Sequence, residues 1–502
     1  MRILKMAGLA VATYLVAPGL ALAQDGGTVT IVLAEEPSFV EPCEASRSDV
    51  GKVLKQNVVE TLTQIDPTDG GIAPRLATAW EQVDDLTWRF SLREGVTFHD
   101  GAAFDAEAVK HSIDRMMDTS IDCEIRTKFF GGTALEVTPV DELTVDIKTD
   151  APSPILPTMM GTVVIVSPNT AMGEYTRSPV GTGPYTFEAW DVGNSITLSR
   201  FDGYWGDMPA VEGAKYIFRS ESPVRAAMVA AGEADIAPNI SVQDADPAAD
   251  FSYPNSETTR LRIDTETAPL DDIRIREALN LAVDRSAIKG TILSPDVMLA
   301  TQLVAPSING HNPDIVSWGY DVEKARALIA QAKADGTPVD SEIHLIGRTG
   351  MFPNSAETME ALQAFFQDAG FNVSLRMVEV GEWLELILKP YAEDRPPILL
   401  IDQHDNNNGD AVFTVFNKYH SEGANSTLHD EELDRTIRAA EQATGDERRK
   451  LFQKAFSIIE ERIIADVMLF HMVGYTRVSE RLSFTPDIST NSELPLEKIS
   501  FK

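Results

Sequence analysis

The chain has only two cysteines, Cys43 and Cys123, among 502 residues. Two thiols cannot build a disulfide-dense scaffold or a four-cysteine zinc site, so this protein must be held together by its hydrophobic cores. The even count allows one disulfide bond in an oxidising compartment, and we expect Cys43 to pair with Cys123. Two buried thiols in a large core are the alternative.

Long apolar runs are absent after the first 23 residues, and a membrane-spanning helix needs about 20 such residues. Arg2 and Lys5, the apolar stretch after them and Ala21-Leu22-Ala23 predict a secretory leader that is cleaved after Ala23. No cysteine directly follows the cleavage site, which argues against a lipid anchor. We therefore expect an exported protein that is not inserted in the membrane; an uncleaved membrane anchor is the alternative.

Basic residues are scarce relative to acidic ones, with 43 Lys and Arg against 77 Asp and Glu. Removal of Arg2 and Lys5 with the leader takes the formal net charge from −34 to −36. This balance argues against nucleic acid and anionic membrane surfaces as partners. It is compatible with a cationic ligand, and a general acidic coat that favours solubility is the alternative.

The chain also lacks low-complexity segments, long Gly/Ser linkers and internal repeats, although its length predicts two or three domains. Helical and strand patterns interleave throughout, which predicts α/β lobes whose boundaries lie in structured crossings. Asp105 is expected to cap a helix, and Asn354 with Glu357 forms a candidate capping box for a helix that ends at Gly370.

Recognisable catalytic motifs are missing as well. The sequence contains neither Gly-x-Ser-x-Gly nor His-Glu-x-x-His, and its eight histidines are dispersed. A calcium loop with Gly409 at its sixth position would begin at His404 and end at Val415, neither of which suits its position. Nothing supports Asp402 and Asp405 as an acid/base pair. We therefore expect no enzyme activity, no cofactor and no metal; a secreted hydrolase is the alternative from another functional class.

The most informative segment that is present runs from Ser178 to Gly206 and reads SPVGTGPYTFEAWDVGNSITLSRFDGYWG. Gly181, Gly183 and Pro184 predict a tight turn in which glycine supplies a positive φ. Apolar and aromatic residues on either side of residues 192–195 predict a hairpin after the turn. The segment has neither the third glycine of a dinucleotide site nor the lysine of a phosphate loop.

This segment resembles a signature of the extracytoplasmic solute-binding proteins of family 5, the oligopeptide/dipeptide-binding type. Three other motifs follow the order of that family. They are Leu92–Gly101 with Phe104–Val109, Gly232–Ile236, and Asp272–Arg285. The resemblance extends from about residue 28 to residue 500.

The resemblance implies a periplasmic-binding-protein-like clamp of class II type, with two lobes and a subdomain inserted in the first. Lobe I would comprise residues 24–58, 189–268 and 471–502. The inserted subdomain would comprise residues 59–188, and lobe II residues 269–470. Two chain crossings would make a hinge, and a ligand between the lobes would favour the closed form.

Candidate ligand contacts follow two strands of the second lobe. A buried strand at Ile398–Ile401 leads into a loop of carboxylates and amides, at the strand end where α/β lobes place ligands. Arg348 follows another strand and could grip a ligand carboxylate. From lobe I, Glu35 and Glu36 could reach the cleft. The loop residues that we expect to bind ligand are Asp402, His404, Asp405, Asn406, Asn407 and Asp410.

In peptide-binding members of the family, an aspartate in an Asp-Pro context pairs with the ligand's α-amino group. Here the proline is absent, and Asn406, Asn407, Asn408 and Asp410 are the nearest positions. Asp402 or Asp405 could replace that contact, or the ligand could differ from an ordinary peptide. An Asx-rich surface turn and a solvated arginine are the structural alternatives for this loop and for Arg348.

The resemblance implies a periplasmic protein that captures a peptide or a similar amine-bearing solute. It would act as a monomer and deliver the solute to the membrane permease subunits of an ABC importer. An opine, a glycoside or a metal chelate is an alternative ligand, because a fold does not fix its function. A ligand-sensing partner of a membrane receptor would use the same clamp.

Overall fold

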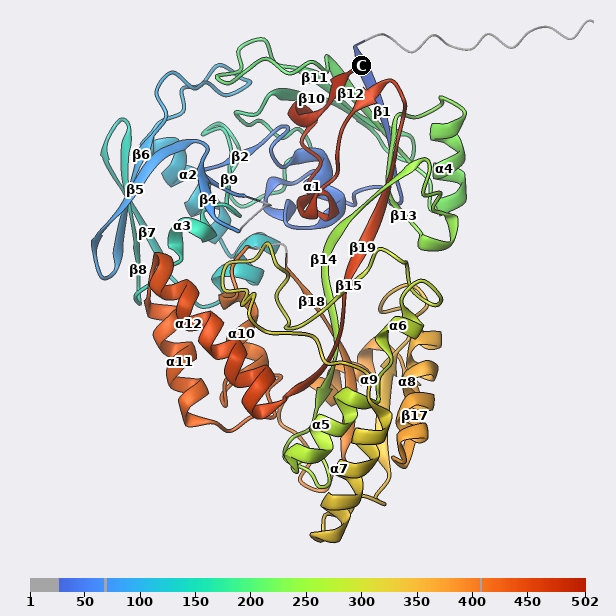
Figure 1. The fold of residues 1–502 in the computed structure, drawn as a ribbon. Helices are drawn as coiled ribbons and strands as arrows, with labels where there is room; N and C mark the ends of the chain where they lie inside the picture. The colour runs from blue at the N-terminus through green and yellow to red at the C-terminus, as the bar shows by residue number, and fades with distance from the viewer. Residues whose placement is uncertain (1–26, 67–69, 407–408) are drawn as a thin grey trace, which may run out of the picture.

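The computed structural model describes residues 27–66, 70–406 and 409–502. The predicted leader and its cleavage site lie outside the described residues, as does Asn407. The described chain is an α/β clamp in which lobe I and an inserted subdomain stand above lobe II in the view of Figure 1. The exact boundaries of these units stay predictions.

One mixed sheet of eleven strands passes through both lobes, in the order β10-β11-β12-β1-β13-β19-β14-β18-β16-β17, with β15 paired to β19. In lobe I, β1 pairs in parallel with β12, and β10 and β11 form the predicted hairpin. The strands of this half are β1 (Thr28–Leu33), β10 (Tyr185–Asp191), β11 (Ser195–Arg200), β12 (Gly213–Phe218) and β13 (Ile236–Ile240). Helices α1 (Ser48–Leu54) and α4 (Ser222–Ala230) flank them.

Two long antiparallel strands, β14 (Asp250–Ile263) and β19 (Asp466–Val478), carry the chain from one lobe to the other. Figure 1 shows both strands running through the middle of the molecule. Strand β19 pairs with β13 of lobe I at one end, and β14 pairs with β19 along its length and with β18 of lobe II at the other end. They are therefore the connections about which the lobes can hinge.

Lobe II is built on β16 (Ile343–Arg348), β17 (Val373–Val378) and β18 (Ile398–Asp405), which run parallel to one another. The side chains of β16 and of the first half of β18 are largely apolar and buried, as expected of parallel strands covered on both faces, whereas β17 at the edge of the sheet is more exposed. Strand β15 (Met298–Leu299) pairs with β19. The covering helices are α5 (Ile273–Ala282), α6 (Arg285–Ile288), α7 (Val322–Ala334), α8 (Ser355–Ala369) and α9 (Val380–Ile387).

A second group of lobe II helices packs around its own apolar core, which includes Tyr419, Phe452 and Phe456. The group comprises α10 (Val412–Tyr419), α11 (Glu431–Gln442), α12 (Gly445–Ser457) and the π-helical turn η4 (Ile458–Ile463). It lies beneath the inserted subdomain in Figure 1. Phe413 of α10 meets Phe129 of that subdomain edge to face, with ring centroids 6.0 Å apart, so the two units are in contact.

The inserted subdomain carries an antiparallel sheet in the order β5-β6-β8-β7, with α2 packed against it. Its elements are β5 (Ala77–Asp84), β6 (Thr87–Leu92), α2 (Ala106–Met117), η2 (Arg126–Phe130), β7 (Leu135–Asp141), β8 (Thr144–Thr149) and α3 (Leu156–Met159). Short ladders join β2 (Glu60–Thr61) to β9 (Val164–Ile165) and β3 (Thr63–Ile65) to β4 (Ile72–Pro74). The remaining short elements are η1 (Pro42–Glu44), η3 (Val242–Asp244), β20 (Leu482–Ser483), η5 (Ile488–Asn491), η6 (Leu496–Lys498) and β21 (Ser500–Phe501).

The Gly-Thr-Gly-Pro-Tyr turn packs against the backbone where the chain leaves lobe I. A Cβ on Gly181 would lie 2.1 Å from the Val58 carbonyl oxygen, and one on Gly183 would lie 2.3 Å from that of Asn57. Neither glycine has a positive φ, so the expectation on that point is wrong. These glycines are required for close backbone approach, and they shape the junction rather than a ligand site.

The two helix-capping predictions have different outcomes. Asp105 accepts a hydrogen bond from the Ala108 amide at 2.9 Å, and α2 begins after it as predicted. Asn354 instead lies at φ +58°, and its side chain donates to the Ile292 carbonyl at 2.7 Å. The capping-box prediction is therefore wrong, although α8 ends at Gly370 as expected.

The predicted disulfide between Cys43 and Cys123 is confirmed, with a Cα–Cα distance of 5.0 Å. It links η1 of lobe I to the inserted subdomain across 80 residues. Because a crosslink restricts the unfolded chain, we expect replacement of both cysteines by alanine to lower the free energy of unfolding by about 4 kcal/mol. Urea denaturation of both proteins, each with and without reductant, measures the effect. A wild-type curve that reductant leaves unchanged would contradict this expectation if peptide mapping shows the bond reduced.

Candidate functional site

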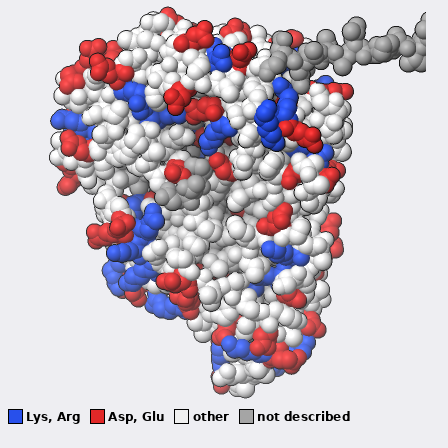
Figure 2. Space-filling model, turned by 45° about the horizontal axis from the view of Figure 1, so that its top comes forward, with Lys and Arg blue, Asp and Glu red and all other residues white. Residues whose placement is uncertain are grey.

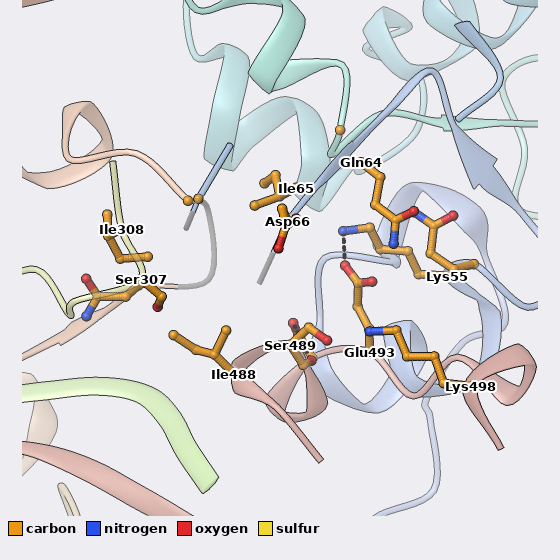
Figure 3. Close-up of a pocket in the computed structure, with 16 residues that line it drawn as sticks. Lys55, Gln64, Ile65, Asp66, Ser307, Ile308, Ile488, Ser489, Glu493 and Lys498 are labelled. Carbon is orange, nitrogen blue, oxygen red and sulfur yellow. Dashed lines mark hydrogen bonds and ion pairs between the residues drawn. The ribbon is translucent and has the colours of Figure 1, made fainter. Parts of the chain in front are cut away.

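A cavity lies between the two lobes, and lobe I, the inserted subdomain and lobe II all contribute to its wall. Lobe I and the inserted subdomain contribute Lys55, Gln56, Gln64, Ile65, Asp66, Gly70, Gly161, Ile488, Ser489, Ser492, Glu493 and Lys498 to its wall. Lobe II contributes Ser307, Ile308, Asn406 and Gly409. Figure 3 shows Ile308 and Ser307 on one side of the cavity and Lys55, Gln64 and Glu493 on the other.

The lobe I wall combines charges of both signs with amides and hydroxyl groups. Lys55 and Glu493 form an ion pair, with each side chain 15% exposed (Figure 3). Lys498 pairs with Asp487 at 3.0 Å near the rim. Apolar contact comes from Ile65 on one side and Ile308 on the other. This mixture suits a small solute that has both polar and apolar parts.

The lobe II wall includes the predicted polar loop, which is shorter than expected. Strand β18 continues through Asp405, so only the residues after it leave the sheet. Asn406 lines the cavity but is 4% exposed, and its amide nitrogen donates to the Ser256 carbonyl and the Thr258 hydroxyl. Its side-chain oxygen accepts from the Ala305 amide at 3.2 Å. Asn406 therefore positions the loop at the edge of the cavity.

Asp402 lies inside a buried ion cluster rather than at the cavity wall. It is 1% exposed, and its carboxylate pairs with Arg260 at 2.9 Å and with Lys418. Burial alone would raise the pKa of Asp402, but Lys418 and Arg260 hold it well below the ordinary value. Since these cations already hold Asp402, we do not propose it as a direct ligand contact.

His404 and Asp410 also have interior surroundings. His404 pairs in register with Thr258 of β14, and burial lowers its pKa well below the ordinary value, so the ring is neutral at pH 7. Asp410 is gripped by the two guanidinium nitrogens of Arg448 at 2.8 and 2.9 Å, and it accepts from the Asn309 amide. Arg448 and Asn309 thus hold the Asp410 carboxylate in place.

Asp405 is the exposed acidic residue at the end of β18, and Glu257 lies opposite it on β14. Ser256, next to Glu257, has a φ of +70° within a bulge of β14 and donates to Asp405 at 2.8 Å. Burial and the neighbouring Asp405 carboxylate raise the pKa of Glu257 to about 7. These two carboxylates are close enough to influence each other, which suits a cationic partner.

Arg348 stands at the carboxyl end of β16, close enough to Glu257 to oppose the rise in its pKa. Its guanidinium lies over the Trp383 ring, 5.1 Å from the centroid. Trp383 is buried, and its indole N–H donates to the Ile401 carbonyl at 2.8 Å, so Trp383 packs in the interior of lobe II. Arg348, Glu257 and Asp405 thus bring both charges to the same end of the lobe II sheet.

The two glutamates predicted from the first strand have different roles. Glu36 accepts hydrogen bonds from the Trp190 indole and the Gly193 amide, so it fixes the hairpin of β10 and β11. Glu35 is exposed and lines a second hollow of about 580 Å³ in lobe I, with Lys52 and Asn239. Burial lowers the pKa of Lys52 to about 8. Glu35 therefore stays a candidate ligand contact, whereas Glu36 has a structural role in holding the hairpin.

The sequence interpretation missed Glu257 and nearly the whole lobe I wall. Glu257 lies in the middle of a long strand, and the wall residues come from residues 55–70 and 488–498. Nothing local marks these residues, because the fold brings distant segments to one cavity. For Glu257, the one available signal was an acidic residue within a strand that is otherwise largely buried.

Charges of both signs are dispersed over the face of the molecule in Figure 2. In Figure 2, Asp and Glu side chains are scattered over the face shown, with Lys and Arg between them. Within residues 27–66, 70–406 and 409–502, no group of three or more His, Cys, Asp and Glu residues is arranged to hold a metal ion. None of the helices in this part of the chain is both long and apolar enough to cross a membrane.

The family model described as "Bacterial extracellular solute-binding proteins, family 5 Middle" matches residues 71–425. The dipeptide-binding protein of Escherichia coli K12 is 28% identical over an alignment of 347 residues, and the match covers 62% of this chain and 65% of that protein. The chain thus covers just under two thirds of that relative's length.

Other similarities extend over nearly the whole chain. A probable di/tripeptide-binding protein of Pseudomonas aeruginosa is 25% identical over 500 residues, covering 91% of this chain and 93% of the relative. The solved structure of HbpA2 from Haemophilus parasuis superposes with a TM-score of 0.82 at 21% identity. It covers 95% of this chain and 100% of HbpA2, and at that identity the likeness concerns the fold.

Proposed function

The chain belongs to the bacterial extracellular solute-binding proteins of family 5, and on that premise we propose that it captures a peptide or a similar amine-bearing solute between its lobes. The observation that carries the proposal is the interlobe cavity, whose wall combines the loop after β18 with charged residues of lobe I. A solute that contacts both walls binds the closed form better than the open form, so it shifts the clamp toward closure.

The predicted chemistry of the solute follows from the charges at the carboxyl end of the lobe II sheet, where Asp405 directly precedes Asn406 of the cavity wall. Asp405 and Glu257 favour an ammonium group, because carboxylates accept charge-assisted hydrogen bonds. Arg348 at the end of the neighbouring strand favours a carboxylate. A small zwitterion such as a short peptide carries both groups. Similarity to proteins named for dipeptides and for di- and tripeptides supports this choice.

The protein acts as a carrier in this proposal and leaves its ligand chemically unchanged. After removal of the leader it works in the periplasm as a monomer, and it passes the solute to the permease subunits of an ABC importer. The acidic, dispersed surface charge suits a protein that stays in solution and away from anionic lipid headgroups.

A thermal-shift screen of di-, tri- and tetrapeptides, amines, sugars and metal chelates tests the proposal. A ligand at a hundredfold excess over its Kd should stabilise the folded state by about 2.7 kcal/mol. We expect short peptides to raise the melting temperature, and mass spectrometry should recover them unchanged. Stabilisation by sugars or chelates alone would contradict the choice of peptide, and steady conversion of a stabilising compound would contradict the carrier role.

Peptide affinity should depend on pH through Glu257. Its pKa is raised to about 7 by burial and by Asp405, so the side chain is mostly protonated at pH 5.5. A ligand ammonium group binds the ionised form of this carboxylate, so binding requires that Glu257 lose its proton. Because that form becomes more populated as the pH rises, the affinity should rise about tenfold between pH 5.5 and pH 7. The peptide's own α-amine stays protonated across this range.

Isothermal titration calorimetry at several pH values measures this dependence. The Glu257→Gln variant should show weaker binding and a nearly flat pH profile. The same raised pKa means that the folded state holds this proton more tightly than the unfolded chain does. Glu257 therefore makes the folded state less stable as the pH rises from about 4.5 to about 7. A wild-type affinity that stays constant with pH would exclude Glu257 from the amine contact.

A further inference from the structure

Gln56 lies in the lobe I wall of the interlobe cavity and carries a buried oxygen atom that the protein leaves unpaired. The residue is 1% exposed, and its side-chain nitrogen Nε2 donates to the Thr61 hydroxyl at 3.0 Å. In the part of the chain that the structure describes, no group donates a hydrogen bond to its Oε1, and no other residue lining this cavity has a buried side-chain atom without a partner. Because an unpaired buried acceptor costs free energy, this oxygen is available to a donor that comes from outside the chain.

Hydrogen bonding also fixes which end of the Gln56 amide is free. The Thr61 hydroxyl donates its only proton to the Thr63 carbonyl at 2.6 Å. It can therefore only accept from Gln56, and the NH2 group of the amide must face it. Turning the amide over would place two acceptors against each other. The free end of the side chain is thus the carbonyl oxygen, which requires a hydrogen-bond donor.

The backbone at Gln56 is strained and firmly held. Its φ is +60°, a value that disfavours every residue with a Cβ. Its amide donates to the Val59 carbonyl at 2.8 Å. The next residue, Asn57, accepts from the Leu496 amide at 2.8 Å and donates to the Leu494 carbonyl at 3.0 Å. A strained residue that its surroundings hold so tightly is typical of a ligand site.

The Gly-Thr-Gly-Pro-Tyr turn supports the backbone directly after Gln56. The Tyr185 amide donates to the Asn57 carbonyl at 2.9 Å, and the Gly183 amide donates to the Val58 carbonyl at 3.1 Å. The close approach of Gly183 to this backbone leaves no room for a side chain. The signature turn, which itself does not line the cavity, therefore fixes the segment that presents Gln56 to it.

We propose that Gln56 is a contact for the bound peptide in lobe I and that its Oε1 accepts a hydrogen bond from a backbone N–H of the peptide. The proposal rests on the proposed peptide-binding function. The adjacent cation, Lys55, already has its own partner in Glu493 (Figure 3). An uncharged acceptor suits the neutral N–H of a peptide bond, whereas the carboxylates Asp405 and Glu257 of the opposite side favour an ammonium group. Each lobe then holds a different part of the peptide, so both contacts form only in the closed clamp.

The experiment combines the best tripeptide from the screen with its singly N-methylated forms, in which one backbone N–H is replaced at a time. Calorimetry at pH 7 measures the affinity of each peptide for the wild-type protein, Gln56→Met and Gln64→Met. Methionine keeps the length of the glutamine side chain and removes the acceptor. Gln64→Met is the matched control, because Gln64 lines the same cavity but is only half-buried, so water can reach its amide.

In the wild type and in Gln64→Met, one of the N-methyl groups should weaken binding about tenfold, because it leaves the Gln56 acceptor buried and unpaired. Gln56→Met should bind the unmodified peptide about tenfold more weakly than the wild type does. The same N-methyl group should then change its affinity by less than about threefold, since neither partner of the hydrogen bond remains. Without ligand, Gln56→Met should melt no lower than the wild type, because the removed acceptor has no partner among the described residues.

An N-methyl effect of the same size in the wild type and in Gln56→Met would overturn the contact and leave the proposed function intact. A wild-type affinity that no N-methyl group changes would do the same, and it needs no variant. If Gln56→Met does not fold, Gln56→Gly takes its place with the same expected result, because glycine readily adopts the positive φ of this position. Failure of every peptide to bind the wild type would overturn the proposed function and this inference together.

Discussion

Replacing Arg260 with leucine should lower the free energy of unfolding by about 3–5 kcal/mol, because it removes a buried cation from between two buried carboxylates. Arg260 is fully buried and donates to Asp402 at 3.0 Å and to Asp466 at 2.7 and 2.8 Å. Strands β19, β14 and β18 are neighbours, so this cluster ties together the centre of the sheet. Tyr419 of α10 donates to Asp466 at 2.6 Å and joins the second helix group to it.

Urea denaturation of wild type and Arg260→Leu measures the loss. The matched control is Arg326→Leu, which removes a 41% exposed arginine from ion pairs with Glu323 and Asp368. Exposed pairs contribute little, so the control should lose less than about 1 kcal/mol. An equal decrease in the free energy of unfolding in the two variants would show that the buried cluster contributes no more to stability than an exposed ion pair does.

Replacing Asp405 with asparagine should weaken the binding of an amine-bearing ligand by more than tenfold. The change removes one negative charge and keeps the oxygen that accepts from Ser256 at 2.8 Å, so the local fold should persist. A charge-assisted hydrogen bond contributes about 1.5–3 kcal/mol, which corresponds to roughly a 10- to 150-fold change in affinity. Calorimetry with the best tripeptide from the screen, at pH 7, measures the effect.

Asp340→Asn is the control for this prediction. Asp340 lies just before β16, at the opposite end of that strand from Arg348, and its side chain is 80% exposed. Its replacement removes the same charge far from the proposed site and should leave the affinity unchanged. Equal affinity of Asp405→Asn and wild type would remove Asp405 from the site. Equal weakening by both variants would assign the effect to net charge.

Much of the fold could be predicted, because the family motifs and the periodic patterns are local. The hairpin of β10 and β11, the cap at Asp105 and the helix end at Gly370 all depend on short-range rules. The prediction that Asn354 caps α8 was wrong because its side chain instead donates to the Ile292 carbonyl, 62 residues away in the sequence. Strand β18 extended through Asp405 because β14 pairs with it along that length.

The candidate site was predicted less completely, because tertiary pairing decides which polar residues face the cavity. We expected Asp402 and Asp410 to be carboxylates of a loop, but Asp402 forms a buried ion pair with Arg260, and Asp410 forms one with Arg448. Local sequence gives no sign of these partners, which lie on β14 and α12. The roles of Arg348, Asp405 and Glu35 as ligand contacts stay predictions.

A crystal structure of the protein with the best peptide from the screen tests the central claim most directly. The account predicts one peptide in the interlobe cavity, with its amine near Asp405 and Glu257 and with residues of both lobes in contact with it. A peptide bound only to one lobe, or on the outer surface away from the loop after β18, would contradict it.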